Sequence, residues 1–147
     1  MPFISLNEFA DRINAIMPML MREFSHKQPE EIYKGKATLP QILILEFLSS
    51  QGQVKMKDIA VFMKVSTSAT TGIVDRLVKS GYAIRVSDQK DRRIVKTMIT
   101  PKGLFLMKKL TNERRRMVID IFGKLSEQDR KDYLRVLTRI KSIFSGG

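Results

Sequence analysis

Two acids and four bases lie within eleven residues of this chain, and their types suit contacts to nucleic acid. The stretch VSDQKDRRIVK, residues 86–96, lies between two segments with the alternating pattern of β-strands and contains Asp88, Lys90, Asp91, Arg92, Arg93 and Lys96. Guanidinium groups bind phosphates and suit the negative potential of a narrow A·T-rich minor groove. A hairpin tip made soluble by charge, or the general lysine-richness of the chain, would explain the same residues. The rest of the chain decides between these interpretations.

The positive charge is concentrated in the middle of the chain. The formal net charge is +12. Residues 54–116 contain 16 bases and 5 acids, whereas residues 1–53 contain 5 bases and 6 acids and residues 117–147 contain 6 bases and 4 acids. A basic surface that served only solubility would be spread along the chain. A surplus confined to one segment predicts a polyanion partner, because phosphate neutralisation with counterion release dominates nucleic-acid affinity.

The side chains that most catalytic or metal sites need are missing. The chain has no cysteine, so thiolate zinc sites, iron–sulfur ligation and thiol redox switching are excluded. His26 is its only histidine. No nucleophile elbow, metal pair or Gly-rich phosphate loop occurs. We therefore expect no enzyme, no cofactor and no metal. Without an apolar run of the ~20 residues that span a bilayer, or a signal peptide, we expect a cytoplasmic protein with no membrane partner.

Periodicity and capping signals predict the elements that precede the charged stretch. Apolar residues at three- and four-residue steps predict a first helix over 6–25, bent or divided at Pro18 and followed by a loop or a loose turn of helix over 26–37. Thr38 and Gln41 have the spacing of a capping box. They open a second helix so rich in apolar residues that we expect burial on more than one side.

A pair of short helices comes next. We expect an amphipathic helix over 57–63, a tight turn at 64–65 and a second helix over 67–80. Ser66 is placed to cap the second helix, and Gly81 to end it as the left-handed residue. Two short helices joined by such a turn, the second one polar at its start, are typical of a helix-turn-helix.

The charged stretch itself forms the tip of a predicted hairpin. Residues 82–86 and 95–99 alternate as half-buried strands, with Tyr82, Ile84 and Val86 sharing one face of the first. A hairpin directly after a helix-turn-helix is a wing. Thr100 then caps a helix over 101–122, whose first residue is a proline that has no donor to lose there.

The terminal helices carry more apolar surface than one domain can cover. The clusters LFLM and MVIDIF are apolar all round, and Ser126 with Asp129 opens a last helix with a clear apolar face. We infer a two-fold homodimer formed by these helices. A monomer that folds them back on its own core is the alternative. The fold class is mainly α with a small β-hairpin wing: a winged helix-turn-helix domain plus N- and C-terminal dimerisation helices.

Three stretches of the chain match the pattern of a known family: TLPQILILEFL at 38–48, DIAVFMKVSTSATTGIVDRLVKSGYAIR at 58–85 and DQKDRRIVKTMITPKG at 88–103. Through these stretches, essentially the whole chain resembles the MarR family of transcription regulators. The resemblance implies one MarR-type domain over 1–147, with the DNA-binding part at 38–100 and helical dimerisation parts at 1–30 and 101–147. It also implies a homodimer on palindromic double-stranded promoter DNA, usually a repressor, often modulated by a small aromatic or phenolic ligand. Lys57 departs from the family, in which Ser or Thr usually starts that helix.

The recognition helix is the first candidate interface. Small hydroxyl side chains let its first turns enter the major groove and can contact base edges or phosphates; they are Ser66, Thr67, Ser68, Thr70 and Thr71. The alternative, helix capping, needs only the first of them. Arg76 could reach the DNA backbone or a neighbouring acid, and Lys57 and Lys79 are candidate phosphate contacts.

The wing is the second candidate interface. By resemblance, Arg93 enters the minor groove and is held by Asp91. An acid beside a DNA-binding arginine restrains a side chain with about 2 kcal/mol of rotamer entropy. Asp88 is expected to shape the turn, and Lys90 and Arg92 to contact phosphates.

The effector is not identified by the sequence. Met17, Met19 and Met21 give an adaptable surface that could line a crevice, although methionines are more often core filler. The missing cysteine excludes the thiol-based peroxide sensing of one branch of the family. An architectural or assembly protein, binding DNA non-specifically or docking a protein partner, is the competing function.

Overall fold

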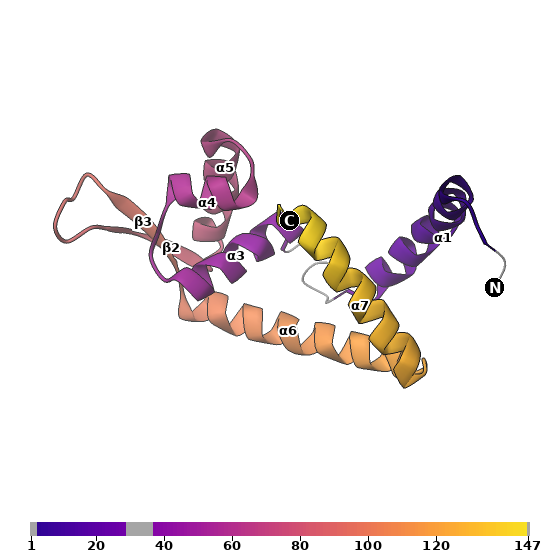
Figure 1. Ribbon diagram of the computed structural model, residues 1–147. Coiled ribbons are helices and arrows are strands. Elements are labelled where there is room, and N and C mark those ends of the chain that lie inside the picture. Colours follow the sequence, from indigo (N-terminus) through magenta and orange to yellow (C-terminus); the bar gives the residue numbers. More distant parts are fainter. Residues whose placement is uncertain (1–2, 29–36, 147) are drawn as a thin grey trace. The chain divides into compact units, whose positions relative to one another are not determined.

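The computed structural model describes residues 3–28 and 37–146 (Figure 1). Most of the loop expected over 26–37 therefore lies outside the described residues. The chain divides into two compact units, Met1–Thr111 and Asn112–Gly147. Its elements are α1 (Leu6–His26), α3 (Leu39–Gln51), β1 (Val54–Lys55), α4 (Met56–Met63), α5 (Thr67–Lys79), β2 (Ala83–Ser87), β3 (Val95–Ile99), α6 (Pro101–Phe122) and α7 (Glu127–Phe144).

Helix α1 is one continuous element. Its N-cap Ser5 accepts a hydrogen bond from the backbone amide of Glu8 at 3.1 Å. Pro18 lies inside the helix without dividing it, so the division allowed by the sequence does not occur. A proline removes one backbone hydrogen bond, and the bonds on either side keep the helix continuous. No residue of α1 is buried.

Helix α3 lies at the centre of the core, as its composition predicts. The expected capping box is present: Gln41 Oε1 accepts from the amide of Thr38 at 3.0 Å, and Thr38 Oγ1 accepts from the amide of Gln41 at 3.4 Å. The core combines α3 residues with side chains from the neighbouring helices and strands, and its α3 members are Ile42, Ile44, Leu45 and Leu48. Burial of these aliphatic side chains is the main stabilising contribution to the first unit.

The helix-turn-helix forms through local caps. Helix α4 begins at Met56, one residue before the predicted start, and its N-cap Lys55 makes no side-chain capping bond. Lys64 takes the left-handed conformation with φ of 56° and ends the helix. Ser66 then caps α5 by accepting from the amide of Ala69 at 3.1 Å. Gly81, with φ of 82°, follows the end of α5 as predicted.

The sheet has three antiparallel strands in the order β1-β3-β2, and the β2–β3 hairpin extends from the helices as the wing (Figure 1). The two-residue strand β1 was not predicted. The prediction of which face of β2 points into the core was also wrong, because Ala83 is buried whereas Ile84 is 44% exposed. Ala83 is paired with Ile99 in the ladder, so it lies on the face that the core covers.

Helix α6 is joined closely to the end of the wing. Thr100 Oγ1 accepts from the amide of Gly103 at 3.1 Å, which confirms the predicted cap, and donates to the carbonyl of Gly81 at 2.6 Å. A Cβ added at Gly103 would lie 2.3 Å from the carbonyl oxygen of Tyr82. The first half of α6 packs in the core of the first unit through Gly103, Leu106, Met107 and Leu110. Residues 37–111, which contain the helix-turn-helix, the wing and the first half of α6, therefore form a winged unit within the first compact unit.

The second unit contains the end of α6 and the whole of α7. Ser126 caps α7 by accepting from the amide of Asp129 at 3.0 Å, as predicted. The rings of Phe122 and Tyr133 pack with their centroids 5.2 Å apart, and Arg130 Nη1 donates to the carbonyl of Phe122 at 3.1 Å. No residue of α7 is buried, and its large apolar side chains remain exposed. Among the described residues, no helix has both the length and the apolar character needed to cross a bilayer.

Candidate nucleic-acid interface

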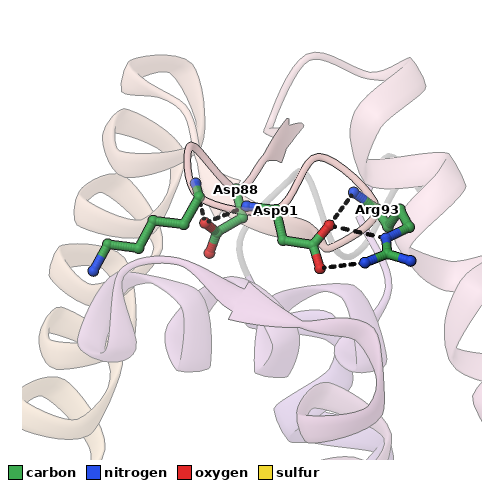
Figure 2. Close-up of polar contacts among 4 residues, drawn as sticks. Asp88, Asp91 and Arg93 are labelled. Atoms are coloured by element: carbon green, nitrogen blue, oxygen red, sulfur yellow. Dashed lines mark hydrogen bonds and ion pairs between the residues drawn. The ribbon is translucent and has the colours of Figure 1, made fainter.

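Asp88 organises the turn at the wing tip (Figure 2). Its Oδ1 accepts from the backbone amides of Lys90 at 2.7 Å and Asp91 at 3.4 Å, while its own amide donates to the carbonyl of Ile94 at 2.8 Å. The hydrogen bond from the Lys90 amide is the largest cause that lowers the pKa of Asp88 below its ordinary value of 3.8. This is the turn-shaping role expected from the sequence.

Asp91 holds Arg93 and leaves its side chain exposed. Asp91 Oδ1 accepts from the backbone amide of Arg93 at 3.0 Å and from Arg93 Nε at 3.2 Å, and Oδ2 accepts from Arg93 Nη2 at 3.5 Å (Figure 2). The Arg93 side chain is nevertheless 92% exposed. The expected pairing is present, and it restrains the guanidinium without covering it.

Lys96, which the sequence did not mark as a site residue, supports the wing from β3. Its Nζ lies 3.4 Å from Asp88 Oδ2, and its side chain is half-buried. Two hollows of about 280 and 660 Å³ share Gln53 and Lys96 in their linings. Neither contains Met17, Met19 or Met21, the methionines considered for an effector crevice.

The start of α5 presents only part of the predicted hydroxyl surface. Ser66, Thr67 and Ser68 are exposed. Thr70 is 0% exposed and its Oγ1 donates to the carbonyl of Ser66 at 2.9 Å, so its assignment as a DNA contact is wrong. A threonine within a helix satisfies its hydroxyl in this way against the preceding turn. Thr71 Oγ1 likewise donates to the carbonyl of Thr67 at 2.8 Å, but this residue remains partly exposed.

The cations around the recognition helix differ in their partners. Arg76, Lys79 and Lys57 are exposed, as phosphate contacts require, and so are Lys90 and Arg92 at the wing tip. The acid next to Arg76 in the sequence, Asp75, is instead paired with Arg85 of β2. This pair was not predicted, because its members lie ten residues apart in different elements, a separation that no helical or strand period marks.

The described residues contain no cluster of three or more histidine, cysteine or acidic side chains that could hold a metal ion. What the winged unit offers instead is an exposed, oriented guanidinium on the hairpin and small hydroxyl groups at the start of a helix. These two features suit the minor and major grooves of a duplex respectively.

Comparison with known proteins agrees with this geometry. The family model described as the MarR family matches residues 37–95. The HTH-type transcriptional regulator YfiV of Bacillus subtilis is 43% identical over 70 residues, which are 48% of this chain and 44% of the relative. The HTH-type transcriptional repressor MdtR of the same organism is 25% identical over 125 residues, 85% of this chain and 81% of the relative.

A solved structure extends the likeness to the fold of nearly the whole chain. The crystal structure of the YusO protein from Bacillus subtilis superposes with a TM-score of 0.77 at 22% identity and covers 95% of this chain and 99% of that one. The match to two curated relatives of Bacillus subtilis is shorter, since the chain spans 44% of the length of YfiV and 63% of the length of the HTH-type transcriptional regulator YsmB. The fold is therefore shared over nearly the whole chain, and the family model matches residues 37–95.

Proposed function

We propose that the protein is a sequence-specific DNA-binding transcription regulator of the MarR family, whose model matches residues 37–95. Members of this family are transcription regulators, not enzymes. The observation that carries the proposal is the wing tip, where Arg93 is 92% exposed and held by Asp91. A surface arginine that served only solubility would need no such restraint.

The two parts of the interface have separate tasks. Helix α5 enters the major groove, where the exposed hydroxyls of Ser66, Thr67 and Ser68 contact base edges or phosphates. Arg93 enters the adjacent minor groove, whose negative potential is greatest where A·T pairs narrow it. The exposed bases Arg76, Lys79, Lys57, Lys90 and Arg92 contact phosphates, which position the protein without reading sequence.

A homodimer on a palindromic operator follows from the exposed apolar surface. The α7 residues Tyr133, Leu134, Leu137, Ile140 and Phe144 are all exposed, and so are most of the large apolar residues of α1. Burial of these residues against a second copy would remove a large apolar area from water. A two-fold dimer presents two winged units, so its operator has two half-sites about one helical turn apart.

Repression and ligand release are the finer parts of the proposal. The name of MdtR as a repressor supports repression, since that relative matches 85% of this chain. A small aromatic or phenolic ligand would release the DNA only if it bound the free form more tightly than the DNA-bound form. Candidate acids can be screened once a duplex is known.

The experiment is a hydroxyl-radical footprint on a duplex that the wild-type protein selects from a randomised pool. We expect a dimer to protect two half-sites with two-fold symmetry. Each half-site should include a minor-groove patch that the wing covers. Continuous coating without symmetry would contradict the proposal and favour an architectural DNA-binding protein.

A further inference from the structure

We infer that the ion pair between Asp75 and Arg85 is a strut that fixes the wing relative to the recognition helix, and that both are positioning residues for DNA selectivity. Arg85 Nη2 donates to Asp75 Oδ1 and joins β2 to the exposed side of α5. The inference rests on the proposed function, because it concerns how that interface is held together.

The acids of the basic segment, residues 54–116, follow a common pattern. Residues 54–116 contain only five acids among 16 bases, and each acid adds repulsion toward phosphates. Three of the five nevertheless pair with a base: Asp75 with Arg85, Asp88 with Lys96, and Asp91 with Arg93. At the wing tip these acids shape the turn and orient Arg93. Asp75 holds Arg85 in the same way, further from the wing tip.

The place of Arg85 in the hairpin explains what the strut controls. Ala83 and Arg85 are two residues apart on β2 and therefore share one face of the strand. Ala83 is buried in the core, whereas the Arg85 side chain is 34% exposed. The ion pair therefore holds the hairpin at a point between its buried base and its exposed tip. The Asp75 side chain is 56% exposed, on the solvent side of α5. The wing loop begins at Asp88, three residues beyond Arg85.

The orientation of the wing relative to α5 matters because the wing must reach the minor groove while α5 lies in the major groove. When one element is bound, a rigid connection raises the effective concentration of the other at its own groove. Without the ion pair, β2 keeps its backbone pairing with β3, but the hairpin loses a side-chain contact with α5. Groups that read base edges need to be held within about 0.5 Å of their binding positions. A more mobile wing therefore reduces selectivity more than overall affinity.

The strut predicts an effect opposite to that of simple electrostatics. Asp75→Asn removes a negative charge from a DNA-binding unit, so charge alone would strengthen binding to every duplex. A strut predicts instead that selectivity, the ratio of affinities for the selected and a scrambled duplex, falls about tenfold. Arg85→Gln should lower it by the same factor. Asp75→Asn with Arg85→Gln should lose no more than either single change, because both remove one interaction.

The test measures binding of full-length variants to the duplex selected by the wild type and to a scrambled version, at one salt concentration. Asp58→Asn is the matched control, since it removes an exposed acid of α4 in the same unit. It should strengthen binding to both duplexes and leave selectivity unchanged. Thermal unfolding checks that each variant is folded. A footprint should show that Asp75→Asn loses minor-groove protection at the wing and keeps protection by α5.

The outcomes separate the inference from the proposed function. If the wild type binds both duplexes equally, the proposed function fails, and the strut with it. If the wild type is selective and Asp75→Asn behaves like Asp58→Asn, the strut alone is overturned. Additive losses from the two single changes would also overturn it. A shared tenfold loss that does not accumulate supports it.

Discussion

At the scale of single residues, the two aspartates of the wing tip act on different partners. Asp88 binds backbone amides and Lys96, and so determines the shape of the turn. Asp91 binds the Arg93 guanidinium and determines its direction. The two aspartates are linked, because Asp88 also accepts from the amide of Asp91, but each has its own side-chain partner, Lys96 or Arg93.

Replacement of Arg93 tests the minor-groove contact. Arg93→Ala should weaken binding to the selected duplex by about 1–3 kcal/mol and remove the preference for A·T pairs at that position. The neighbouring Arg92→Ala is the control, because loss of a phosphate contact should weaken all duplexes alike and lower the salt slope by about 1. Fluorescence anisotropy at several salt concentrations measures both. Retained affinity and A·T preference in the Arg93 variant would show that the wing does not read the groove.

The pH dependence of the turn follows from Asp88. Its pKa lies below the ordinary 3.8 because the Lys90 amide, above all, stabilises the carboxylate. A lowered folded-state pKa means that the stabilisation is complete above 3.8 and is lost only as the pH falls through the lower, folded value. NMR titration of the side-chain carboxyl carbon, with amide shifts of Lys90, checks this. A midpoint at or above 3.8 would contradict the hydrogen bonds.

At the scale of elements, the structure shows which features local sequence can predict. Helix starts at Thr38, Ser66, Thr100 and Ser126 were predicted because capping joins residues three apart. The hairpin followed from alternation between apolar and polar residues. These signals need no knowledge of distant contacts.

The features that were missed depend on distant partners. Strand β1 exists only through its pairing with β3, and Ala83 is buried because the core covers its face. Thr70 looked like a surface hydroxyl, yet the same helix face packs in the core. The tie between Asp75 and Arg85 likewise joins two elements. For the site, the sequence predicted the turn bonds of Asp88 and the pairing of Asp91 with Arg93, but it wrongly placed Thr70 on the exposed side of α5.

The junction of α6 with the wing provides a stability test. Gly103→Ala places a Cβ 2.3 Å from the Tyr82 carbonyl oxygen and should destabilise the fold by about 1–3 kcal/mol. Gly72 in α5 is a matched control, because a Cβ there meets nothing within 4 Å. Gly72→Ala should stabilise the protein by up to ~1 kcal/mol through helix propensity. Urea unfolding measures both, and a gain in stability at residue 103 would refute the close packing.

At the scale of the whole molecule, the basic excess and the apolar faces of the terminal helices have different places along the chain. The basic excess lies in residues 54–116, while α1 and α7 have no buried residue and expose most of their large apolar side chains; Val61 and Phe105 are exposed within the basic segment as well. A chain with such a division suits DNA at one part and a second copy at another. This division was visible in the sequence, because both the charge count and the helical periodicity are properties of the chain itself.

The dimer can be tested on α7. The wild type should sediment at about twice the 16.9 kDa chain mass. Leu137→Glu places a charge among the exposed apolar residues and should shift the protein toward monomer and weaken binding to a two-half-site duplex. Ser142→Glu adds the same charge to the polar side of α7 and should leave the dimer intact. Equal behaviour of both variants would place the dimer contact elsewhere.

The most direct measurement compares the wild-type protein on its selected duplex and on random DNA at ~150 mM salt. A specific regulator should bind the selected duplex at least ~1,000-fold more tightly. That result would establish sequence reading by the wing and recognition helix. Equal and strongly salt-dependent binding to both duplexes would contradict the account, since phosphate neutralisation by the basic segment would then explain all of the affinity.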